Sequence, residues 1–515
     1  MKSPAPAFAR GMNFLAQLAI SLALLLLPVT SLPLLSKLML GASVSSSSSG
    51  TSVAPPSVVF ILCLALGWLP VYLLRGGKLP GETAPFLVFV VVALIASAAA
   101  FFLPILPNKG YIVRNAELKA LITLAMGVAT YLIITLWHRQ IEQFKWALWL
   151  INISGILMVA WSLVQLYYVL FNSSSYPPYV MRIQTLFSTR DLINLAFHGR
   201  VLGFSFEPSW LAHQLNVLFI PYWLAATVTG YSVTKKLLHV SMENVLLVVG
   251  LVVWYYTLSR VGLVAFALIL GYLFYRANLR GLRWLQNRLR ARLADRKSGN
   301  TRRTETVLMA LLVLALFVIY VGGFIGFLYL LPHINHRFGS LLKWQSYASN
   351  LLEYAFRLGF AERVVYWSVG WEIFARYPVL GVGLGNAGFF FPQMMPNLGY
   401  RLTEITALFY NSSTLPNIKS FWLRLLAESG LVGFSLFVAW QYVQWHAGKF
   451  LRLNGSMLLR TLGWMGTFTI LAFLVEGFSV DSFALPYLWV SMGLLSAAAA
   501  LARNEAIDPR SQQGQ

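Results

Sequence analysis

The stretch at 85–106, PFLVFVVVALIASAAAFFLPIL, contains no charged residue and is long enough to cross the hydrocarbon core of a bilayer as a helix. Similar apolar runs recur along the chain of 515 residues, of which 58% are hydrophobic and only 11% charged. Lipid offers no water to the backbone, so each crossing run must satisfy its own hydrogen bonds as a helix. We therefore predict an all-α, polytopic integral membrane protein.

About twelve runs have the length that a crossing helix needs. They lie at roughly 12–34, 57–74, 85–106, 118–137, 146–170, 209–230, 240–258, 261–275, 306–331, 421–445, 461–480 and 484–502. The first run lacks a small-residue cleavage site and is followed by further spans. We therefore expect it to remain as a helix and not to be removed as a signal peptide.

Basic residues alternate along the chain in a way that sets the orientation. If the N-terminus is cytoplasmic, every short inside segment carries Lys or Arg, and the segment at 276–304 carries the most. No aromatic or Gly-rich RNA-binding pattern accompanies these charges, so we interpret the net charge of +22 as topology and lipid contact, without a nucleic-acid partner. This predicts a multi-pass protein of the inner membrane with both termini in the cytoplasm.

The predicted spans divide the chain into four parts. Residues 1–208 hold five helices and an outer loop, 209–331 hold helices six to nine with the basic loop 276–304, and 421–515 hold the last three helices and a tail. The remaining part, 332–420, is a long extracytoplasmic loop that exceeds the usual length of a connector. Its helically spaced apolar residues predict a helix at the membrane surface: Phe356, Val364, Trp367, Trp371 and Phe374.

Ionisable residues gather at helix ends on the predicted outer face, among them Arg200, Glu207, Arg260, Arg363, Lys419, Glu476 and Asp481. Charge beside hydrocarbon is costly and persists where it has a partner or a task. Cations from distant parts of the chain would suit an anionic ligand such as a diphosphate, which arginine grips with two hydrogen bonds. The alternative is that they are helix-end residues that reach the interface and pair with acids or headgroups.

Three further features allow two interpretations each. Glu207 precedes Pro208 and would suit a helix N-terminus as well as a proton transfer. His213 would be a proton carrier or a histidine with a structural partner. The glycines of the segment 378–386, PVLGVGLGN, do not follow a strand as a nucleotide loop would; we expect them to allow a tight backbone path against a ligand or a neighbouring helix.

Three ordered segments resemble the O-antigen ligase and O-antigen polymerase superfamily of bacterial envelope proteins. The first is Ser259-Arg260 at the end of a helix, and the second is Arg363 with Trp367 followed by the glycine segment 378–386. The third is a helix start whose pattern is matched by Leu423, Leu426, Glu428 and Gly430. The resemblance covers roughly 200–502 and implies a glycosyltransferase type C-like membrane fold.

The resemblance implies a transferase that takes a glycan from a polyprenyl (undecaprenyl) diphosphate carrier and joins it to an acceptor sugar, without metal or nucleotide cofactor. Its partners would be the lipid-linked oligosaccharide, the acceptor glycan, the bilayer and envelope polysaccharide assembly proteins. It also implies site residues: Arg260 and Arg363, joined by Arg200, for the diphosphate, and Trp367, Tyr366 and Asn386 for the glycan.

The chain departs from the ligase pattern at one position. Where ligases carry a histidine that activates the acceptor hydroxyl, it has Lys419, followed by Ser420 in place of asparagine. A protonated lysine is no base, so Lys419 would bind phosphate or act only if its surroundings kept it neutral; otherwise Glu207 or His213 would take the proton. The departure favours a polymerase of O-antigen or exopolysaccharide repeats over a ligase that transfers glycan to a lipid core. A flippase or transporter is the alternative of another class, which we favour less because the charges fall at helix ends.

Overall fold

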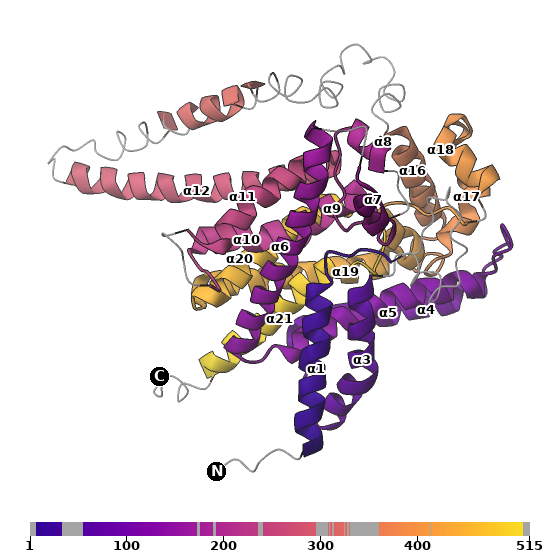
Figure 1. Ribbon diagram of the computed structural model, residues 1–515, viewed down its shortest axis with the longest axis horizontal. Helices are drawn as coiled ribbons and strands as arrows, with labels where there is room; N and C mark the ends of the chain where they lie inside the picture. The colour runs from indigo at the N-terminus through magenta and orange to yellow at the C-terminus, as the bar shows by residue number, and fades with distance from the viewer. Residues whose placement is uncertain are drawn as a thin grey trace. The chain divides into compact units, whose positions relative to one another are not determined.

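The computed structural model describes residues 7–32, 55–171, 176–188, 192–234, 240–294, 360–412 and 414–507, together with parts of 307–329. Within these ranges the regular elements are helices (Figure 1). Eight of the described helices are long and apolar enough to cross a membrane, and shorter apolar helices accompany them. These helices confirm the predicted all-α, polytopic membrane class.

The chain divides into two compact units, Met1–Phe266 with Tyr366–Gln515, and Ala267–Val365. The first unit contains most of the described helices. Its N-terminal half comprises α1 (Ala7–Leu25), α3 (Pro56–Leu74), α4 (Ala84–Ala100), α5 (Val113–Trp137), α6 (Ile141–Phe171), and the short α7 (Pro178–Thr185) and α8 (Leu192–Phe197). Next come α9 (Pro208–Gln214), a π-helical turn (Leu215–Phe219), α10 (Ile220–Thr229) and α11 (Met242–Tyr255).

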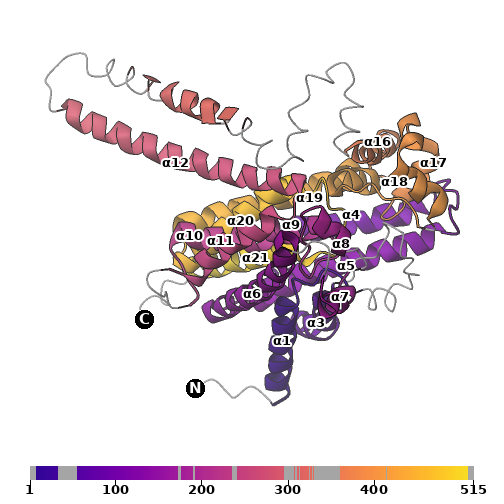
Figure 2. The same cartoon turned by 45° about the horizontal axis from the view of Figure 1, so that its top comes forward.

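The C-terminal half of the first unit is built on three long helices that contact one another: α19 (Phe421–Asn454), α20 (Met457–Glu476) and α21 (Pro486–Ile507). They lie side by side in both views (Figures 1 and 2). Before them come α16 (Ala361–Arg376), α17 (Phe391–Met394) and α18 (Thr403–Thr406). The structure therefore confirms a helix within the predicted outer loop, over 361–376; Phe356, which was predicted to share it, lies outside the described residues.

Two of the observed differences from the predicted spans concern α12 and α11. The helix that was expected at 261–275 is α12, which runs from Arg260 to Ala294 and so includes much of the predicted basic loop. The reason is that leucine and arginine are good helix formers, so the basic stretch continues the helix. In contrast, α11 has only 14 residues. The Ser-rich loop at Ser45 to Ser52 and most of the predicted span 306–331 lie outside the described residues.

The sixth span is interrupted by a π-helical turn that has a clear cause in the sequence. Pro221 has no N–H and cannot donate to the carbonyl of Val217 four residues earlier. That carbonyl instead accepts hydrogen bonds from Thr469 Oγ1 of α20 at 2.9 Å and from Ser491 Oγ of α21 at 3.0 Å. The irregular turn is therefore satisfied by its neighbours and ties α9 and α10 to the C-terminal helices.

An aromatic cluster packs α4, α5, α19 and α21 together. The rings of Phe86 and Trp440 lie 4.7 Å apart between centroids, and Trp440 stacks on Trp489 at 5.7 Å. Trp440 Nε1 donates to the Tyr131 hydroxyl at 3.2 Å, which leaves neither polar group unpaired in the core. This packing holds the second half of α19, after Gly430, and the first turn of α19 belongs to the site described next.

Candidate functional site

Six of the predicted outer-face residues lie where α9, α12 and α19 begin and where α11 and α20 end, which we call the site end of the first unit: Arg200, Glu207, Arg260, Lys419, Glu476 and Asp481. The turn between α11 and α12 forms one side of it. Val201 N donates to Tyr256 O at 3.0 Å, and Arg200 Nε donates to Thr257 O at 3.0 Å. Arg200 is thereby held beside the turn that leads into Arg260.

Arg260 is the first residue of α12 and is partly buried. The Ser259 hydroxyl caps this helix by accepting from Gly262 N at 3.1 Å. A helix start carries a partial positive charge from its backbone dipoles, and an arginine at this position adds a full charge of the same sign. The Ser259-Arg260 pair, with Arg200 hydrogen-bonded to the turn before it, therefore forms a positive end that favours an anion.

A buried polar bridge links this helix start to α20 and to the π-helical turn. Asn216 Nδ2 donates to Gly262 O at 3.0 Å and to Glu476 Oε1 at 2.7 Å. The other oxygen of Glu476 lies 3.4 Å from His213 Nδ1, and His213 and Glu476 are only 2% and 1% exposed. His213, one of the predicted proton carriers, thus has a buried carboxylate partner and joins α9 to α20.

The start of α19 is fixed to the loop that follows α20. Ser420 Oγ caps α19 by accepting from Leu423 N at 3.4 Å, and it donates to Gly477 O at 3.3 Å. Phe421 N donates to the same carbonyl at 2.7 Å. Because Gly477 directly follows Glu476, these bonds bring Lys419 to the end of the bundle that carries Arg260.

Lys419 pairs with an acid that the sequence did not single out. It adopts a left-handed backbone conformation with φ of 51°, and its ammonium forms an ion pair with Glu404. The ammonium also lies 4.7 Å from the centre of the Tyr366 ring, whose hydroxyl donates to Glu404 Oε1 at 3.1 Å. From sequence, Glu404 resembles an ordinary acid in the first turn of α18, so nothing marked it as functional.

The glycine segment 378–386 packs against a kink in α19. Gly430, at φ 61° and ψ −168°, breaks the helix and turns Leu431 N toward Pro378 O, which accepts at 2.8 Å. On the other side of the kink, Gly383 N donates to Glu428 O at 3.0 Å. A Cβ added at Gly381 would lie 2.5 Å from Ala427 O. The glycines therefore allow a tight backbone path against a neighbouring helix, one of the two expected uses.

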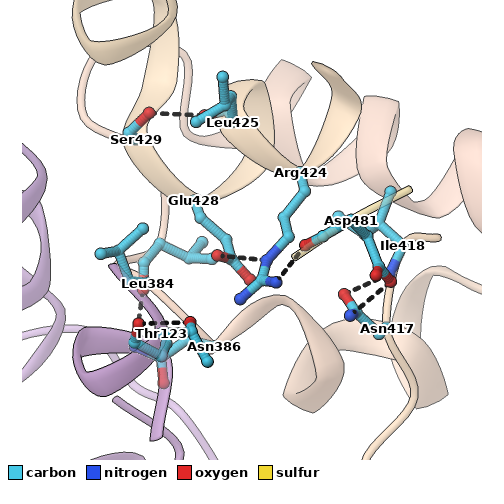
Figure 3. A network of polar contacts seen from close by, with 12 residues as sticks. Thr123, Leu384, Asn386, Asn417, Ile418, Arg424, Leu425, Glu428, Ser429 and Asp481 are labelled. Carbon is cyan, nitrogen blue, oxygen red and sulfur yellow. Dashed lines mark hydrogen bonds and ion pairs between the residues drawn. The ribbon is translucent and has the colours of Figure 1, made fainter. Parts of the chain in front are cut away.

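We call the contact between the glycine segment 378–386 and the kink of α19 the joint. Buried polar groups hold it in place (Figure 3). Arg424 Nε donates to Glu428 Oε2 at 2.9 Å, and Arg424 Nη1 donates to Asp481 O at 2.6 Å. Asn386 is fully buried, and its amide donates to Glu117 Oε1 of α5 at 2.7 Å. Glycan contact by Asn386 stays a prediction; the observed contact fastens the glycine segment to α5.

Three predicted residues remain to be described: Trp367, Arg363 and Glu207. Trp367 packs on Phe478 of the loop after α20, with 5.5 Å between ring centroids. Arg363 lies four residues earlier on α16 but within the second compact unit, so its contact with a diphosphate stays a prediction. Glu207 is at the N-cap position of α9, where its main-chain oxygen accepts from Trp210 N at 3.0 Å and its carboxylate from Ser209 Oγ at 3.3 Å.

A family model described as O-Antigen ligase matches residues 245–438. The match includes Ser259-Arg260, the glycine segment and the start of α19, and it confirms the predicted similarity to the O-antigen ligase and polymerase superfamily. No curated protein matches the chain. Arg200, Glu207, His213 and Glu476 lie outside the matched range, so it is the structure that brings them to the site end.

Proposed function

We propose that this protein, whose residues 245–438 match the O-antigen ligase family, is a membrane glycosyltransferase that takes its glycan from a polyprenyl diphosphate carrier. The observation that carries the proposal is the positive helix start at Ser259-Arg260, with Arg200 hydrogen-bonded to the turn before it and Lys419 at the same end of the unit. The positive-inside rule assigns the basic loops to the cytoplasmic side, and this favours an extracytoplasmic location for the end that carries these cations.

The proposed chemistry uses cations to stabilise a leaving group. When the bond between the sugar and the diphosphate breaks, negative charge grows on the phosphate oxygens. Arg260 at the start of α12 and Arg200 beside it would stabilise that charge, and the Ser259 cap keeps the helix start rigid. A preorganised donor of this kind contributes on the order of 10²–10³ to the rate.

We further propose that the product is a polymer of O-antigen or exopolysaccharide repeats. The support is the ligase histidine position, where this chain has a lysine that is ion-paired with Glu404. The alternative is a ligase, since the matching family model carries that description. The product separates them: a ladder of repeat units indicates a polymerase, and a single transfer onto a lipid core indicates a ligase.

The test uses the purified full-length chain in lipid nanodiscs with an undecaprenyl diphosphate-linked oligosaccharide, without nucleotide and with EDTA. We expect glycan transfer by the wild type and a loss of about 10²–10³ in rate for Arg260→Ala. The control is Arg75→Ala, an exposed arginine just after α3, which should match the wild type. Full activity in Arg260→Ala would reject the site, and label that crosses a vesicle membrane without glycan transfer would indicate a transporter.

A further inference from the structure

We infer that Glu404 accepts the proton of the acceptor hydroxyl, while Lys419 and Tyr366 hold its carboxylate in place. The inference rests on the proposed glycosyl transfer and supplies the residue that the sequence left open. It starts from the three-residue cluster of Lys419, Glu404 and Tyr366, which brings together the start of α19, the start of α18 and the middle of α16.

The contacts determine which member of the cluster can act as a base. The Lys419 ammonium is engaged with a carboxylate and an aromatic ring, and an ammonium has only donors and no lone pair to take a proton. The Tyr366 hydroxyl is used in donating to Glu404. Glu404 is the member that only accepts, since an ionised carboxylate carries lone pairs and no proton of its own.

Exposure favours Glu404 over the other candidates at the site end. Its side chain is 46% exposed, so a hydroxyl of a sugar could reach it. His213 and Glu476 are 2% and 1% exposed and pair with each other. Glu207 is only partly exposed at the start of α9, where its carboxylate accepts from Ser209. A base must come within hydrogen-bond reach of the proton it removes, and the exposed carboxylate of Glu404 is open to such an approach.

The step balances without any further reactant. The acceptor hydroxyl gives its proton to the Glu404 carboxylate while its oxygen forms a bond to the anomeric carbon of the donor sugar. The bond from that carbon to the diphosphate oxygen breaks, and the electron pair leaves with the polyprenyl diphosphate. Glu404 then returns its proton to water. Lys419 and Tyr366 act as positioning residues, because they touch the base and not the sugar.

The test measures transfer by the full-length protein from an undecaprenyl diphosphate-linked oligosaccharide, together with binding of that donor. We expect Glu404→Gln to lower kcat by about 10²–10⁴ and to leave donor binding within twofold of the wild type. Glu404→Asp should restore part of the rate, and added formate should restore part of it in Glu404→Ala. The matched control is Glu372→Gln, an exposed acid on α16, which should keep wild-type kcat.

A second variant tests the cluster by its pH dependence and does not require Glu404 to be changed. Without the ammonium of Lys419, a carboxylate holds its proton to higher pH. Lys419→Met should therefore lower kcat and move the acidic limb of the rate profile to higher pH, whereas Lys419→Arg should leave the limb in place. A Lys419→Met variant whose acidic limb stays where the wild type has it would overturn the inference.

The outcomes separate this inference from the function it rests on. If the wild type transfers glycan and Glu404→Gln does so at the same rate, the inference fails and the proposed function stands. If Glu404→Gln loses donor binding in step with kcat and formate restores nothing to Glu404→Ala, Glu404 is not the base. If the wild type itself transfers no glycan, both proposals fall.

Discussion

The kink in α19 makes Gly430→Ala a sharp test of how the site is held. Gly430 has φ 61° and ψ −168°, a region that residues with a Cβ rarely enter, at a cost of about 1–3 kcal/mol. An added Cβ would overlap the carbonyl of Val379 in the glycine segment, a backbone group with little freedom to move. The substitution must therefore separate the two segments.

Separation would also cost the hydrogen bonds across the joint. Leu431 N donates to Pro378 O at 2.8 Å and Val432 N to Val379 O at 3.3 Å, each worth about 0.5–1.5 kcal/mol net. With the backbone strain, the expected loss in the free energy of unfolding is roughly 2–6 kcal/mol. Glu428 and the start of α19, which belongs to the site end, lie just before the kink in the chain. We therefore also expect lower transfer activity.

The assay compares unfolding of Gly430→Ala and wild type in detergent, by heat and by denaturant. The control is Gly67→Ala on α3, where an added Cβ meets no atom within 4 Å and alanine favours the helix by up to about 1 kcal/mol. We expect the control to be at least as stable as the wild type. A Gly430→Ala protein that unfolds with the wild type would refute the described joint.

Two further predictions concern buried charge and pH. Glu428→Gln removes the ion partner of Arg424, which is 9% exposed, and should lower the free energy of unfolding by about 3–5 kcal/mol in denaturant titrations; an unchanged midpoint would contradict the pairing. Burial lowers the pKa of His138, just after α5, to about 4 from 6.5. The unfolded chain then protonates this histidine more readily than the folded chain does. The contribution of neutral His138 to the free energy of unfolding is therefore fully present above pH 6.5 and is lost as the pH falls toward 4, by up to about 3 kcal/mol. His138→Gln should flatten melting temperatures over that window, and an equal decline in both proteins would exclude His138 as the cause.

The sequence predicted the class of fold well because lipid imposes one strong rule: apolar runs of sufficient length form helices. It predicted helix ends less well. The basic stretch after 275 was expected to be a loop, yet α12 continues to Ala294, because positive charge orients a span without ending a helix. Likewise, Pro221 gave no hint that Thr469 and Ser491 would satisfy the free carbonyl of Val217.

In the candidate site, too, features formed by neighbouring residues could be predicted, whereas contacts between distant residues could not. Ser259-Arg260 was recognisable because its two residues are neighbours in the chain and match a short motif of the resembled superfamily. Glu404 was missed because its significance comes from Lys419 and Tyr366, which lie 15 and 38 positions away. His213 and Glu476 are 263 positions apart, so their pairing could not be foreseen from spacing. Contacts between distant segments decide which charges act together.

The most direct test of the central claim is the release of the carrier during glycan transfer. With a doubly labelled undecaprenyl diphosphate-linked oligosaccharide in nanodiscs, we expect one undecaprenyl diphosphate to appear for each new glycosidic bond. In Arg260→Ala both products should fall together by about 10²–10³. Glycan that stays on its carrier in the wild-type reaction, or equal release by wild type and Arg260→Ala, would contradict the account.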